Sequence, residues 1–92
     1  MYIDMGAYRV IHGVVTQGRV NDRQWVTSYK VEALGNGWVP VLNEAGSSTF
    51  TGNTDQNTQV WQRFRNPETA RYVKFTPLSW IAHISMRAGL LI

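Results

Sequence analysis

The sequence predicts an all-β fold, an antiparallel sandwich or barrel, and three observations support this prediction. No stretch of the chain shows a sustained helical period of apolar residues. Turn signals rich in Gly, Asn, Asp and Pro recur about every ten residues, which is typical of sandwiches and barrels. Apolar and polar residues alternate between these turns, as in strands with one buried face. A chain of 92 residues is one domain at most, so residues 1–92 are predicted to form a single domain.

The first part of the chain predicts two strands before a polar loop. Residues 2–5 form a short strand closed by Gly6, and residues 7–17 form a long β-rich run interrupted by Gly13. A glycine inside a strand indicates a bulge or the close approach of another backbone. The Gly18-Arg19 sequence then leads into a short polar excursion at residues 20–24, and a rigid scaffold would present this charged loop as a contact surface.

The clearest strand covers residues 25–34. Its odd-numbered positions, from Trp25 to Ala33, are expected to face one way, toward the core. The even-numbered positions, including Val26, are expected mostly to face water. The Gly35-Asn36-Gly37 sequence that follows predicts a tight turn, because Asn and Gly adopt positive φ at little cost.

The second half of the chain predicts further strands separated by turns. Residues 38–42 form one of them, and Pro40 marks it as edge-like or bulged. A turn is predicted at residues 65–68, where Pro67 favours an extended residue before it. The other predicted strands are residues 49–51, 58–64, 70–76 and 82–90, with loops at residues 43–48 and 52–57.

Composition and charge argue against several classes of protein. The net charge is +3, and the nine Lys and Arg residues are scattered along the chain, so no nucleic-acid partner is predicted. No apolar run approaches the roughly 18 residues that a membrane-spanning helix needs. The N-terminus shows no signal-peptide pattern. The absence of cysteine excludes disulfides and thiolate metal sites within this sequence.

No catalytic or metal-binding constellation is evident, so the chain is predicted not to be an enzyme and to carry no cofactor and no metal. The carboxylates form no evident acid–base pair, and there is no nucleophile elbow or phosphate loop. His12 and His83 each lack a second ligand at metal-site spacing. The Asp55-Gln56-Asn57 run could offer oxygens to calcium, but a turn is favoured because calcium needs six or more oxygen ligands.

The four tryptophans have two kinds of position. Trp25, Trp38 and Trp61 lie within predicted strands and are interpreted as core or sheet-face residues. Trp80 lies at a strand end, where it either closes the rim of the sandwich or offers a ring to a sugar or a protein interface. The sequence leaves these two alternatives for Trp80 open.

Several motifs occur in a fixed order: GVVTQGR, QWVTSYKVE, FTGNTD and PETARYVKFTPLSWIAHISMR. Together they resemble the discoidin domain, also called the coagulation factor V/VIII C-type domain, over essentially the whole chain. The resemblance implies a jelly-roll β-sandwich of the galactose-binding type. It also implies a non-catalytic, extracellular or cell-surface adhesion module that binds a glycan, collagen or another protein, or an anionic phospholipid surface through loops at one end.

The chain also differs from the family pattern. Family domains are longer, and the additional part lies before Tyr2, so the chain is expected to lack the first strands of the sandwich. Exposed sheet edges pair readily with other chains, which makes a self-associating assembly module the alternative function. Gly89 stands where the family usually has an acidic residue, so Arg87 is expected to lack its customary partner.

The resemblance places a ligand site in the loops around residues 18–25 and 79–83. Arg19 of the TQGR motif, Gln24 and His83 match positions that contribute to ligand binding in collagen- and glycan-binding relatives. From the residues alone, Arg19 is read as a solvated loop charge or a partner of Asp22. The predicted ligand-binding residues are Arg19, Asn21, Asp22, Gln24, Trp80 and His83.

Overall fold

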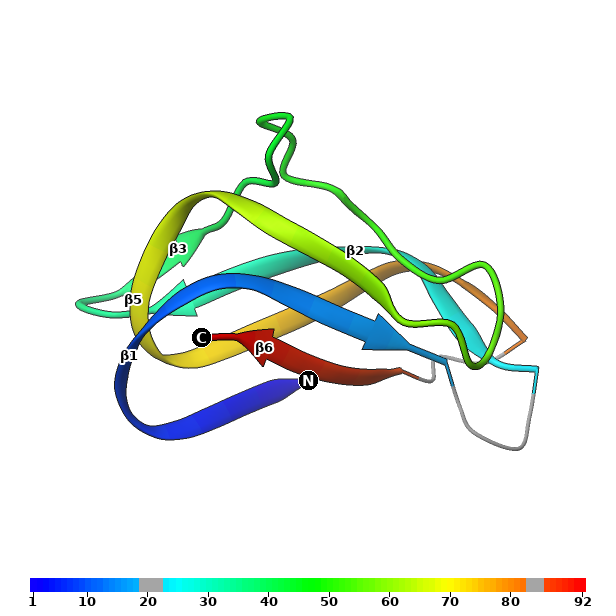
Figure 1. Ribbon diagram of the computed structural model, residues 1–92, viewed down its shortest axis with the longest axis horizontal. Helices are drawn as coiled ribbons and strands as arrows, with labels where there is room; N and C mark the ends of the chain where they lie inside the picture. The colour runs from blue at the N-terminus through cyan, green and yellow to red at the C-terminus, as the bar shows by residue number, and fades with distance from the viewer. Residues whose placement is uncertain (19–22, 83–85) are drawn as a thin grey trace.

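The computed structural model describes residues 1–18, 23–82 and 86–92, and the described residues form antiparallel strands without a helix (Figure 1). The strand order in the sheet is β3-β2-β5-β1-β6, with β4 paired to β2. The predicted all-β class is therefore confirmed. The strands are β1 (Tyr2–Gln17), β2 (Trp25–Leu34), β3 (Trp38–Pro40), β4 (Phe50–Thr51), β5 (Val60–Ile81) and β6 (Arg87–Leu91). Within the described residues, no helix is long and apolar enough to cross a membrane.

The two longest strands, β1 and β5, curl back on themselves, so each of them contributes to two layers (Figure 1). Residues 13–16 of β1 pair with residues 60–63 of β5 and, on the other side, with β6. Residues 2–4 of β1 pair instead with residues 72–74 of β5, which also pair with the end of β2. The curled strands fold the sheet into a sandwich whose core lies between the layers.

Two predicted strand breaks, at Gly6 and at residues 65–68, are wrong, because both lie inside continuous strands. Each coincides with a shift of register between β1 and β5. Asp4 and Arg9 of β1, five positions apart, pair with residues of β5 that are only two positions apart. In the same way, Arg63 and Glu68 of β5, five positions apart, pair with residues of β1 that are only two positions apart. Extra residues of this kind bend a strand without ending it. Gly6 and residues 65–68 therefore mark bends, and these bends allow β1 and β5 to contribute to both layers.

Gly13 lies in β1 where that strand is flanked by β5 and β6. A Cβ atom at this position would lie 2.5 Å from the Gln62 carbonyl oxygen and 2.9 Å from Cδ1 of Leu91. The register also shifts between Ile11 and Gly13. The prediction of a bulge or close backbone approach at this glycine is confirmed.

The alternation predicted for β2 is correct from Tyr29 to Ala33 and wrong at Val26. Tyr29, Val31 and Ala33 are buried as expected, but Val26 is fully buried as well. The pairing of β2 with β5 shifts register on both sides of Ser28. An irregularity of this kind reverses the facing of the residues beyond it, so Val26 and Tyr29 share the buried side although they are three positions apart.

The core is built around aromatic rings from three strands. The Tyr29 ring stacks on Phe50, with centroids 5.5 Å apart, and lies 5.8 Å from Phe75. Phe50 in turn meets Phe64 edge-on at 6.0 Å. Burial raises the pKa of Tyr29 to about 12, because an apolar surrounding disfavours the phenolate. The nearby Thr16 hydroxyl acts in the opposite direction and lowers this pKa, although neither hydroxyl reaches hydrogen-bond geometry within the described structure.

The outer strands are shorter than predicted. β3 ends at Pro40, and its place at the end of the strand order confirms that this proline marks an edge. β5 continues through Pro77 to Ile81, and Ala82 then adopts a left-handed φ of 64°. The predicted final strand at residues 82–90 is therefore wrong at its start, since β6 begins only at Arg87.

Candidate ligand-binding end of the sandwich

Two of the six predicted ligand-binding residues, Gln24 and Trp80, lie in the described structure. The backbone pairs Trp25 with Ile81 and Val26 with Trp80, so the start of β2 and the end of β5 meet at the same end of the sandwich (Figure 1). The structure therefore brings Gln24 and Trp80 to one end, as the sequence predicted. The other four, Arg19, Asn21, Asp22 and His83, lie outside the described residues.

Gln24 and Trp80 differ in how much surface they present. Gln24 is only 8% exposed and already makes contacts, whereas Trp80 is 44% exposed. Leu78 and Ile81, on either side of Trp80, are exposed to a similar degree. Neighbouring exposed apolar side chains of this size are a common feature of interaction surfaces. This end of β5 therefore presents an apolar rim to solvent.

The apolar rim, Leu78, Trp80 and Ile81, rests on a fixed backbone. The Ser79 hydroxyl lies 2.6 Å from that of Ser28 and also contacts the Thr27 hydroxyl, both of β2. These contacts coincide with the register shifts between β2 and β5. Cross-strand hydroxyl pairs stabilise a sheet locally, so these contacts fix the part of β5 that carries the rim to β2.

Arg87, the first residue of β6, connects three segments at this end. Its Nε donates to the Gly18 carbonyl oxygen at 2.7 Å, and its Nη2 donates to the Gln56 carbonyl oxygen at 3.2 Å and to Asn57 Oδ1 at 3.5 Å. We expected this arginine to lack its customary acidic partner, and the structure shows that neutral oxygens receive its donors. Arg87 therefore joins the end of β1 and the loop before β5 to β6.

These segments approach one another closely at Gly18. A Cβ atom there would lie 2.6 Å from the Gln24 carbonyl oxygen and 2.9 Å from the Gln56 Cα atom. Real Cβ atoms do not come so close to backbone atoms. The glycine of the TQGR motif thus allows the two ends of the 18–24 loop and the loop before β5 to pack together.

Asn53 holds the loop between β4 and β5 against the core. Its side chain is almost completely buried, and its Nδ2 donates to the carbonyl oxygens of Thr16 and Thr58, both at 2.9 Å. The backbone N–H groups of Gly52 and Asn53 donate to carbonyl oxygens of β2 at 2.8 Å. The FTGNTD motif therefore encodes a loop attached to two strands.

Asp55 confirms that the Asp55-Gln56-Asn57 run is a turn. Its Oδ1 accepts hydrogen bonds from the N–H groups of Asn57 and Thr58, and its Oδ2 accepts one from the Thr58 hydroxyl at 2.6 Å. The Thr58 hydroxyl and backbone, more than Asn57, hold the pKa of Asp55 below its ordinary value of 3.8. Across the described part of the chain, no cluster of three or more acidic, His or Cys side chains could hold a metal ion.

A hollow of about 210 Å³ opens beside Arg87. Gln17 and Gln59 line it with the first residues of β6, and Gln17 Nε2 donates to the Asn57 carbonyl oxygen. Its lining offers amide and guanidinium groups, which suit hydroxyl, carbonyl or anionic ligands. Sequence reasoning missed this hollow, and the only signal for it was the polar composition of the flanking loops.

The fold and its gathered loops define a β-sandwich of the galactose-binding type. The sequence model of the F5/8 type C domain matches residues 1–90, and the chain belongs to this family. The discoidin resemblance noted in the sequence is thereby confirmed. Domains of this family are binding modules and not enzymes.

Individual relatives agree with this assignment. Retinoschisin of Takifugu rubripes is 31% identical over 96 residues, covering 100% of this chain and 34% of that protein. Lactadherin of Mus musculus is 36% identical over 95 residues, covering 99% of this chain and 20% of that protein. The solved structure of wild-type discoidin II from Dictyostelium discoideum has a TM-score of 0.84 at 30% identity and covers 97% of this chain and 34% of that one. The chain thus spans about a third or less of these relatives.

Proposed function

We propose that this domain is an extracellular or cell-surface recognition module that binds its ligand at the loop end of the sandwich. The observation that carries the proposal is the exposed apolar rim of Leu78, Trp80 and Ile81, held beside loops that Arg87 ties together. Membership of the F5/8 type C family supports a binding role.

The chemistry of this end favours an anionic surface among the ligands that the family resemblance implies. Arg23, two residues before β2, and Arg87, the first residue of β6, are both exposed, and the chain has a net charge of +3. Exposed apolar side chains bordered by cations suit a negatively charged lipid surface, where apolar burial and electrostatic attraction act together. A glycan and collagen or another protein are the other ligands that this end could recognise.

The proposed contact residues remain those predicted from the sequence: Arg19, Asn21, Asp22, Gln24, Trp80 and His83. Trp80 would supply the apolar contact, and Arg19 would supply a planar set of donors for phosphate, carboxylate or hydroxyl groups. Gln24 is largely buried, so its part in the site would be to hold the loop base and offer at most an edge contact.

Vesicle binding provides the test. Phosphatidylcholine vesicles with and without phosphatidylserine, a collagen peptide and a glycan array are presented to the wild type, Trp80→Ala and Arg19→Ala. We expect binding to the phosphatidylserine vesicles that weakens with salt, and each substitution should reduce it by about 1–3 kcal/mol. Trp61→Ala, which removes an exposed tryptophan of the other layer, is the matched control. Equal binding of wild type and Trp80→Ala to whichever ligand binds would contradict the proposed site.

A further inference from the structure

A groove at the opposite end of the sandwich combines aromatic rings with a carboxylate. It has a volume of about 320 Å³. The lining residues are Tyr2, Asp4, Leu34, Trp38 and Tyr72. They come from β1, the β2–β3 hairpin and the middle of β5, whose backbones are paired at these positions. Strand β2 has Trp25 at the loop end and Leu34 at the groove, so the two sites lie about 30 Å apart at the usual rise per residue.

The aromatic residues of this groove present much of their surface to solvent. Tyr2 is 61% exposed and Trp38 is 41% exposed. Their ring centroids lie 5.9 Å apart and their planes are tilted by 55°. Two large rings set at an angle form a concave apolar surface that a ligand with an apolar face can cover. Ligand pockets of this size characteristically combine such walls with a few fixed polar groups.

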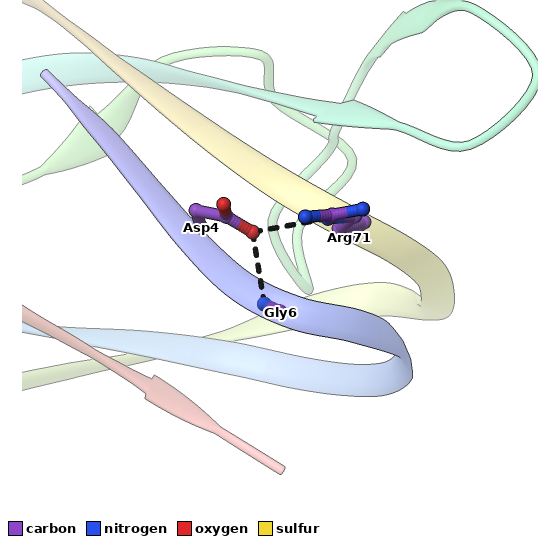
Figure 2. Close-up of polar contacts among 3 residues, drawn as sticks. All are labelled: Asp4, Gly6 and Arg71. Atoms are coloured by element: carbon purple, nitrogen blue, oxygen red, sulfur yellow. Dashed lines mark hydrogen bonds and ion pairs between the residues drawn. The ribbon is translucent and has the colours of Figure 1, made fainter.

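Asp4 supplies a fixed acceptor at the edge of the groove. Its Oδ1 accepts hydrogen bonds from the Gly6 N–H at 2.8 Å and from Arg71 Nε at 3.2 Å (Figure 2). Gly6 donates from a backbone with a φ of 74°, a conformation that suits glycine. The Gly6 hydrogen bond, followed by that of Arg71, holds the pKa of Asp4 below its ordinary value, so the group stays a carboxylate. Within the described residues, Oδ2 has no hydrogen bond and can accept one from a ligand.

The charges around the groove are already balanced. Arg71 pairs with Asp4, and its guanidinium carbon lies 5.2 Å from the centroid of the Tyr72 ring. Lys74 lies 4.0 Å from Glu32 and 5.9 Å from the centroid of the Tyr2 ring. A cationic ligand would compete with these two cations for the same rings and carboxylates, and an anionic ligand would meet no excess positive charge. The balance favours a neutral ligand.

We propose that this groove is a second binding site, for the pyranose ring of a neutral glycan. A pyranose has an apolar C–H face that packs on aromatic rings, and its hydroxyl groups both donate and accept hydrogen bonds. Asp4 Oδ2 accepts from one hydroxyl, and the Lys74 ammonium group donates to another. A proline-rich peptide also packs on aromatic grooves, but prolines carry no N–H to satisfy Asp4. The groove lies apart from the loop end and does not depend on the function proposed there.

Nuclear magnetic resonance titration of the full 92-residue chain tests this proposal. The probes are methyl glycosides of galactose, glucose, mannose and N-acetylglucosamine, their oligosaccharides, and a polyproline peptide. We expect at least one saccharide to shift the Trp38 indole signal and the Tyr2 and Tyr72 ring signals with saturable dependence on concentration. This mapping uses the wild-type protein and is independent of the folding of any variant.

Substitutions then separate the groove from other sites. Trp38→Ala is expected to weaken saccharide binding about tenfold or more, because it removes one ring of the concave surface. Asp4→Asn should weaken it severalfold, while Trp61→Ala, outside the groove, should leave it unchanged. The proposal is overturned if no saccharide shifts these signals, if only the polyproline peptide does, or if Trp38→Ala binds as tightly as the wild type.

Discussion

Arg87 shows how one side chain can organise the loop end. Its acceptors, the Gly18 and Gln56 carbonyl oxygens, lie 69 and 31 positions away in the sequence. Each hydrogen bond joins a charged donor to a backbone oxygen, and such bonds are stronger than those between neutral groups. Because the three segments meet at this guanidinium, its loss should loosen the base on which the apolar rim is displayed.

Replacing Arg87 by alanine is expected to lower the free energy of unfolding by about 1–2 kcal/mol, since two charged hydrogen bonds to the backbone are lost, of which the one to Gly18 is partly buried. Urea unfolding monitored by tryptophan fluorescence measures the change. Arg63→Ala, on an exposed position of β5, is the control and should change stability by less than about 0.5 kcal/mol. Equal stability of Arg87→Ala and wild type would show that the three segments are held by other contacts.

Asp55 predicts a specific pH dependence. Its folded-state pKa is lower than its ordinary value of 3.8, so its contribution to stability is complete above that value and is lost as the pH falls through the folded-state pKa. Asp55→Asn should therefore lower the melting temperature at pH 7, and the difference from wild type should shrink toward about pH 2. Glu44→Gln, at an exposed position of a different loop, is the control. A difference that stays constant with pH would contradict this assignment.

The sequence predicts which residues lie at the loop end of the sandwich better than it predicts the contacts between them. The motif order placed Gln24 and Trp80 at one end, and the structure agrees. The roles of Arg87 and Asn53 were missed, because their partners are backbone carbonyl oxygens of segments far away in the chain. Every residue carries a backbone carbonyl group. The sequence therefore does not show which residue will accept a hydrogen bond from such a side chain.

At the scale of single strands, the bends of β1 and β5 are the features that local patterns misread. Their local patterns predict a strand end at Gly6 and a turn at Pro67, but both residues lie at register shifts inside a strand. A residue that disturbs pairing has the same local signature whether the strand ends or bends there. A strand that bends differs from one that ends only in that its partner strand bends with it. β1 and β5 bend together in this way.

Gly13 gives a direct test of the packing between β1 and its neighbours. Gly13→Ala should destabilise the domain by about 1–3 kcal/mol, since the new Cβ would meet the Gln62 carbonyl oxygen at 2.5 Å. Gly37→Ala, in the β2–β3 turn, is the matched control, because nothing lies within 4 Å of its Cβ position. Thermal unfolding followed by circular dichroism compares the two. Similar melting temperatures for both variants would mean that β1 can shift away from β5.

At the scale of the whole molecule, the sheet has β3 and β6 as its outer strands. β3 has three residues and ends in Pro40, features that limit pairing with another chain. β6 has five residues, Arg87–Leu91, and pairs on one side with β1. Of the two edges, β6 is therefore the better candidate for the self-association that the sequence suggested.

We predict that the 92-residue chain forms dimers through β6 at micromolar and higher concentration. Leu91→Lys should shift the equilibrium toward monomers, because a charge on an edge strand opposes pairing. Sedimentation velocity over a series of concentrations measures the change, with Val39→Lys on β3 as the matched control. A compact wild-type monomer at every concentration, or dimers that resist Leu91→Lys, would rule out this edge as the interface.

The curling of β1 and β5 also determines how the chain must fold. The Met1 amino group donates to the Phe75 carbonyl oxygen at 3.1 Å, and the Phe75 N–H donates to the Met1 carbonyl oxygen at 2.8 Å. Neither layer can form from a local hairpin, because both need contacts between the first and last parts of the chain. Closing such large loops costs conformational entropy before the stabilising contacts have formed, so folding should take milliseconds to seconds. Since the same two strands hold both layers, the layers should also protect their amides from hydrogen exchange together and lose that protection in one cooperative step.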